Sequence, residues 1–84
     1  MRAEAIQAEL RRIGLRLRSI RTERGFTQAE AAARSGLHTV QIARLEAGQR
    51  NVTISSLVAL AQAFGVPLIE LIAPREQPDA PPGA

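Results

Sequence analysis

The chain has 84 residues, which fits one small domain near the lower size limit for independent folding. It has no cysteine and a single histidine, which excludes disulfides and thiol catalysis and argues against a structural zinc site. All eleven cationic side chains are arginine, and the formal net charge is +3. The excess of positive charge favours a polyanionic partner. The exclusive use of arginine would also arise in a GC-rich genome.

No segment reaches the run of about 20 apolar residues that a membrane span requires. Glu4 and Glu9 interrupt the N-terminal region, where a secretory signal would be continuously apolar. We therefore expect a cytoplasmic protein.

Apolar residues recur at helical spacing along the chain and nowhere alternate as in a strand, so the predicted fold class is all-α. The first predicted helix covers residues 3–23, and Gly25 is suited to cap its C-terminal end. The apolar stripe of this helix consists of Ile6, Leu10, Ile13, Leu17 and Ile20.

A capping box marks the start of the second helix. The Thr27 hydroxyl can accept a hydrogen bond from the Glu30 amide, while the Glu30 carboxylate accepts one from the Thr27 amide. This pattern predicts a short helix over residues 28–34. Gly36 then supplies the tight turn before a third helix over residues 39–47, and two short helices joined in this way form a helix-turn-helix.

Two further helices complete the predicted fold. Thr53 is suited to cap a fourth helix over residues 54–64, and Pro67 suits the first turn of a short fifth helix that reaches residue 72. Residues 73–84 include four prolines and are predicted to be disordered.

The third predicted helix has one apolar and one open face. With about 100° per residue, Ile42 and Leu45 fall on the same side and anchor the helix. The opposite side carries Val40, Ala43, Arg44 and Ala47, and Thr39 stands at the N-terminal tip. One packed face and one free face are what a helix needs to enter the major groove of DNA.

The run over residues 13–72 resembles the lambda-repressor/Cro-like (XRE) helix-turn-helix family, which includes phage repressors and restriction–modification controllers. The resemblance is carried by Arg21, the segment 25–28, Ala32, Gly36, Ile42, the segment 45–46, Gly48, Leu57, Ala61 and the segment 64–66. It implies a five-helix DNA-binding domain over residues 13–72. Residues 1–12 are then an N-terminal helical extension and residues 73–84 a tail.

Four residues are predicted to read DNA bases. Arg44 is the principal candidate, because its planar guanidinium matches guanine O6 and N7. Thr39 can bond to a base edge, while Val40 and Ala43 can contact a thymine methyl. The alternative for Arg44 is a solvated surface side chain.

A second set of residues is predicted to contact DNA phosphates. It consists of Gln28, at the N-terminus of the second helix, and of His38, Gln49, Arg50 and Asn51. A polar surface loop is the alternative for Gln49, and a partly buried imidazole is the alternative for His38. The family resemblance also implies that Arg21 and Glu46 form a structural salt bridge that orients the third helix.

A homodimer is expected because one such domain covers too few base pairs, and two third helices would lie about 34 Å apart on a palindromic site. The preferred interface is the fifth helix and its surroundings, namely Phe64, Val66, Leu68, Ile69 and Ile72. The N-terminal extension is an alternative interface. Another possibility is that these residues complete the core of the monomer.

The sequence thus predicts a sequence-specific, DNA-binding transcriptional regulator that acts as a homodimer on double-stranded DNA. The alternative is an antitoxin or another protein-binding module with secondary DNA binding. No paired acid–base residues or phosphate loop suggest an enzyme, and no cofactor, metal or small-molecule ligand is expected.

Overall fold

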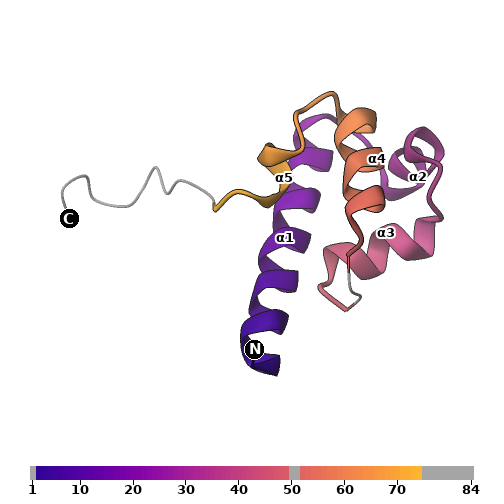
Figure 1. Cartoon of the computed structure of the whole chain (residues 1–84). Helices are drawn as coiled ribbons and strands as arrows, with labels where there is room; N and C mark the ends of the chain where they lie inside the picture. The colour runs from indigo at the N-terminus through magenta and orange to yellow at the C-terminus, as the bar shows by residue number, and fades with distance from the viewer. Residues whose placement is uncertain (1, 50–51, 75–84) are drawn as a thin grey trace.

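The computed structural model describes residues 2–49 and 52–74, and this part of the chain folds into α-helices without any strand (Figure 1). The helices are α1 (Ala3–Glu23), α2 (Gln28–Ser35), α3 (Thr39–Glu46), α4 (Ile54–Phe64) and α5 (Ile69–Ile72). The all-α fold with five helices is confirmed. The tail beyond Pro74, predicted to be disordered, lies outside the described residues.

Helix α5 begins two residues later than the sequence predicts. The Glu70 amide donates to the Pro67 carbonyl and the Leu71 amide to the Leu68 carbonyl, which is the three-residue spacing of a tight turn. The chain therefore leaves Pro67 in a single tight turn, and the α-helix begins only at Ile69.

One aliphatic core lies between all five helices. It consists of Leu17, Ile20, Ala31, Ala32, Ile42, Leu45, Leu57, Leu60, Ala61, Phe64 and Leu71. Phe64 stacks on Phe26 with ring centroids 6.2 Å apart, and the Arg34 guanidinium lies 4.5 Å from the Phe26 centroid. The two aromatic rings thus close the end of an otherwise aliphatic core.

Helix α1 extends beyond the hydrophobic core at its N-terminal end. Its N-terminal end projects beyond the other helices (Figure 1), and Ile6 is 42% exposed there. Leu10 is buried, so the packed part of α1 begins within the predicted extension rather than at residue 13. The extension of residues 1–12 and the domain are therefore joined by one continuous helix.

Helix α1 crosses the C-terminal end of α3 at very short range. A Cβ atom added to Gly14 would collide with the Leu45 carbonyl oxygen and would lie 2.7 Å from the Glu46 carbonyl oxygen. At Gly48, which has a φ of +70°, an added Cβ would lie 2.9 Å from the Arg11 Cα. Two glycines, one on each segment, thus permit the backbones to touch.

We expect Gly14→Ala to destabilise the protein by about 1–3 kcal/mol, because the new methyl group must push a backbone carbonyl aside. At an open helix position the same change would stabilise by about 1 kcal/mol. Urea denaturation of the variant therefore tests the contact, because the sign of the change in the free energy of unfolding differs between the two cases. A stabilised variant would show that α1 and α3 do not approach as described.

Candidate nucleic-acid interface

The N-terminus of α2 is fixed by the capping box predicted from the sequence. The Glu30 amide donates to the Thr27 hydroxyl at 3.0 Å, and the Thr27 amide donates to the Glu30 carboxylate at 2.8 Å. These bonds to Thr27 lower the pKa of Glu30. Gln28 follows directly, so its position at the start of α2 is set by local chemistry.

The turn between α2 and α3 depends on Gly36. Its φ of +79° lies in the left-handed region, and its amide donates to the Ala32 carbonyl at 2.9 Å. The exposed His38 then precedes α3, and its amide donates to the Gln41 side-chain oxygen at 3.4 Å. His38 is thus a cap residue outside the helix, not a partly buried imidazole.

Helix α3 has the two faces that its helical phase predicts. Ile42 and Leu45 are each 2% exposed, whereas Val40 is 60% exposed. Thr39 and Arg44 are exposed and Ala43 is half-buried. Within residues 2–49 and 52–74, the Arg44 side chain has no hydrogen-bond or ion-pair partner.

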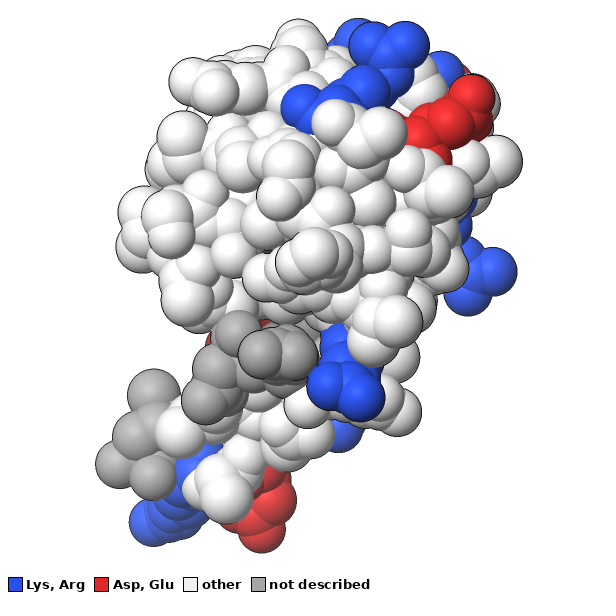
Figure 2. Space-filling model, turned by 90° about the vertical axis from the view of Figure 1, so that its right-hand side faces the viewer, with Lys and Arg blue, Asp and Glu red and all other residues white. Residues whose placement is uncertain are grey.

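Figure 2 shows the side of the molecule on which α2 and α3 lie. Most of its surface is formed by uncharged side chains. Basic side chains lie at the upper edge, on the right and in the lower half of this view, and acidic side chains lie next to them at the upper right and at the lower end.

A polar junction at Glu46 joins α1, α2 and α3. The Arg21 Nε donates to Glu46 Oε2 at 2.6 Å and its Nη2 to Oε1 at 3.1 Å, while the two side chains are only 11% and 5% exposed. The Gln28 Nε2 also donates to Oε1 at 3.1 Å, and Arg21 Nη1 donates to the Phe26 carbonyl at 2.7 Å. The bidentate pair therefore fixes α3 to α1, and the Gln28 bond ties the same carboxylate to α2.

This junction gives Gln28 a role that its sequence position alone does not reveal. The residue is half-buried and its amide nitrogen is used by Glu46. The second Nε2 hydrogen and the backbone amide of Gln28 remain for a phosphate. The loop after α3 begins with the exposed Gln49, whereas Arg50 and Asn51 lie outside the described residues.

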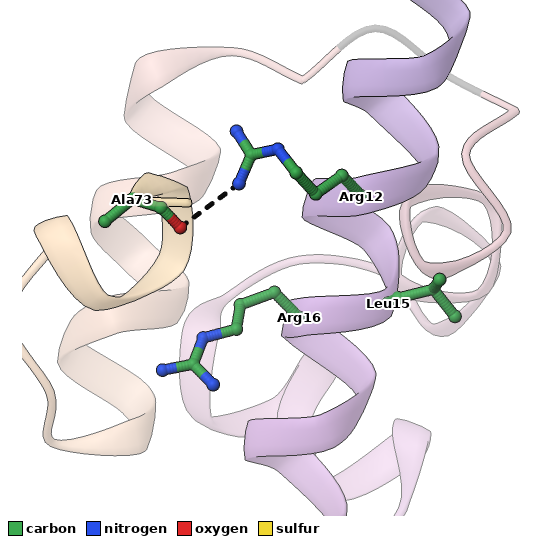
Figure 3. A pocket seen from close by; sticks show the side chains of 4 residues that line it. All are labelled: Arg12, Leu15, Arg16 and Ala73. Atoms are coloured by element: carbon green, nitrogen blue, oxygen red, sulfur yellow. Dashed lines mark hydrogen bonds between the residues drawn. The ribbon is translucent and has the colours of Figure 1, made fainter. Parts of the chain in front are cut away.

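Two arginines of α1 fix α5, and sequence reasoning did not single them out. Arg12 donates to the carbonyls of Ile72 and Ala73 at 3.0 and 3.1 Å, and Arg16 donates to the Glu70 carbonyl at 2.8 Å. Figure 3 shows Arg12 reaching Ala73 beside a shallow cavity of about 170 Å³. These bonds satisfy carbonyls at the end of a helix of one turn.

Of the residues predicted for a dimer interface, Ile69 is 59% exposed, whereas Val66, Leu68 and Ile72 are half-buried. Phe64 is only 3% exposed and stacks on Phe26. Because it has almost no surface left for a partner, we assign Phe64 to the monomer core, in place of the interface predicted from sequence.

A profile described as helix-turn-helix matches residues 17–71, which is most of the chain. The chain belongs to the helix-turn-helix family. This assignment agrees with the XRE-type resemblance of the sequence, and the proteins of this type are DNA-binding transcription regulators.

Relatives of this helix-turn-helix protein include y4dJ of Sinorhizobium fredii, an HTH-type transcriptional regulator 42% identical over 65 residues, which cover 77% of this chain and 84% of y4dJ. The control protein C.SmaI of Serratia marcescens is 38% identical over 56 residues, or 67% of each chain. The crystal structure of the restriction-modification controller protein C.AhdI of Aeromonas hydrophila is similar, with a TM-score of 0.75 and 39% identity. That match covers 76% of this chain and 97% of C.AhdI.

Across its described residues, the protein has no helix with the length and apolarity needed to cross a membrane.

We expect Glu46→Ala to destabilise the protein by about 3–5 kcal/mol, because it leaves the Arg21 guanidinium buried without its partner. Glu9→Ala is the matched control. Glu9 forms an exposed pair with Arg12, and such pairs contribute about 1 kcal/mol or less. Equal losses in unfolding free energy for both variants would contradict a special role of the Glu46 junction.

Proposed function

We propose that the protein is a sequence-specific transcriptional regulator that binds a palindromic operator as a homodimer. The observation that carries the proposal is the two-sided character of α3. Ile42 and Leu45 hold the helix to the core, while Thr39, Val40 and Arg44 face solvent. A helix held in this way can enter the major groove without unfolding any part of the domain.

Arg44 is the proposed base-reading residue. Its exposed guanidinium can donate two parallel hydrogen bonds to guanine O6 and N7. Thr39 at the tip of α3 can bond to a neighbouring base edge. Val40 and Ala43 form the apolar part of the same face and are suited to thymine methyl groups.

The phosphate contacts are proposed at both ends of the helix-turn-helix. Gln28 and His38 lie at the N-termini of α2 and α3, where helix amides attract anions. Gln49 is exposed shortly after α3, and the predicted contacts at Arg50 and Asn51 fall outside the described residues. Contacts of this kind fix the register of the protein on DNA and do not read sequence.

The homodimer is proposed to form through the α5 face. Ile69 is 59% exposed although it lies on a helix fixed to α1 by Arg12 and Arg16. A firmly held apolar side chain loses little conformational entropy when it is covered. The alternative face is on α1, where Ile6 on the projecting end and Leu15 further along the helix are 42% and 63% exposed.

Selection of duplexes from a random pool tests the DNA-binding proposal. We expect an inverted repeat with half-sites about one DNA turn, or ~34 Å, apart. Arg44→Ala should weaken binding to that site by about 5- to 150-fold and relax the preference at one G·C pair. The control Arg24→Ala removes the same charge at the C-terminal cap of α1, outside α3, and should keep the preference for that G·C pair. Enrichment of no sequence by the wild-type protein would contradict the proposal.

Sedimentation of the free protein tests the interface. We expect the wild-type protein to be a dimer and Ile69→Glu to be a monomer, because a carboxylate must then be desolvated in the interface. Ile54→Glu is the matched control, since Ile54 is 66% exposed at the start of α4 and outside the proposed interface. Loss of the dimer in Leu15→Glu but not in Ile69→Glu would assign the interface to α1. A wild-type complex with a different small protein would support the antitoxin alternative.

A further inference from the structure

Arg11 lies across the end of α3, at the point where the two backbones touch. Its Cα and Cγ atoms would each be 2.9 Å from a Cβ placed on Gly48, so the stem of the side chain passes over this glycine. Gly48 is buried, whereas Arg11 is exposed. The stem of the Arg11 side chain thus lies beside the start of the loop that follows α3.

The same corner of the molecule carries two residues of the proposed DNA surface. Gln49 directly follows Gly48, and its amide donates to the Arg44 carbonyl at 3.0 Å. The contact between Arg11 and Gly48 therefore places α1 beside the C-terminal end of the proposed reading helix. This position belongs to residues 1–12, the predicted N-terminal extension, in which no residue was among the predicted DNA contacts.

Three arginines of α1 have bonding partners, whereas the exposed Arg11 and Arg18 have none within the described residues. Arg12 and Arg16 donate to carbonyls around α5, and Arg21 donates to Glu46. Arg11 has no hydrogen-bond or ion-pair partner within the described parts of the chain. Its helix neighbours three and four residues away are Gln7, Ala8, Gly14 and Leu15, none of which is acidic.

We propose that Arg11 binds a DNA phosphate next to the groove that α3 enters, so that the N-terminal part of α1 extends the binding surface beyond the helix-turn-helix. This inference rests on the proposed function. A phosphate is the expected ligand because the side chain is a free cation at the edge of the proposed base-reading face, next to the proposed phosphate contact at Gln49. The contact adds affinity and register, and it reads no sequence.

The test compares Arg11→Gln with Arg24→Gln on the selected duplex and on an unrelated duplex. Glutamine keeps the Cβ and Cγ that pack on Gly48 and removes the charge. Arg24 is exposed at the C-terminal cap of α1, beside Gly65, and provides an equal loss of charge about 20 Å further along α1 than Arg11. Dissociation constants are measured over a range of salt concentrations, and circular dichroism checks that each variant is folded.

For Arg11→Gln we expect about tenfold weaker binding to both duplexes at low salt and a fall of about 0.9 in the slope of log affinity against log salt. Arg24→Gln should keep the wild-type slope, and Arg11→Lys should restore most of the lost slope. Equal slopes for Arg11→Gln and Arg24→Gln, with the wild-type protein bound normally, would overturn the phosphate contact. Failure of the wild-type protein to bind any duplex would instead overturn the proposed function.

Discussion

The carboxylate of Glu46 is the point on which the arrangement of the first three helices depends. It accepts from Arg21 on α1 and from Gln28 on α2 while it sits on α3 itself. Burial of a charged pair costs several kcal/mol of desolvation, which is offset only when geometry and further hydrogen bonds are favourable. Here the pair is bidentate, and Arg21 also reaches the Phe26 carbonyl. The direction in which α3 points is therefore set by directional bonds as well as by apolar packing.

Close backbone contact holds α1 and α3 together in addition to the ion pair between Arg21 and Glu46. Gly14 and Gly48 allow α1 to lie directly on the end of α3, so the two helices cannot separate without losing this contact. The same contact carries the side chain of Arg11 to the loop after α3. One long helix thus contributes to the core, to the orientation of the reading helix and to the proposed DNA surface.

Much of the fold is predictable because its signals are local. The capping box at Thr27, the turn at Gly36 and the helical phase around Ile42 depend only on residues within one or two turns. The structure agrees with all three. Local signals also explain why the bounds of α1 and α4 agree with those predicted, whereas α5, with little helical length, begins later than expected.

The remaining features depend on contacts between residues that are distant in sequence. The spacing of apolar residues along the chain does not indicate such contacts. Arg12 and Arg16 bond to carbonyls more than 50 residues away, and nothing near them in the chain indicates those partners. The interface prediction included Phe64 because its apolar neighbours suggested a surface, but its stacking on Phe26 places it inside. The two faces of α3 are thus predicted from sequence, and its ion pair between Arg21 and Glu46 is implied by the family resemblance. The bonds that fix α5 are found only in three dimensions.

Amide chemical shifts of the labelled protein during titration with the selected duplex test the central claim most directly. If α3 enters the groove, the largest changes fall on residues 39–44 and at the start of α2, while the amides of α4 stay nearly unchanged. Changes confined to α4 and α5, with the amides of α3 unmoved, would contradict the account.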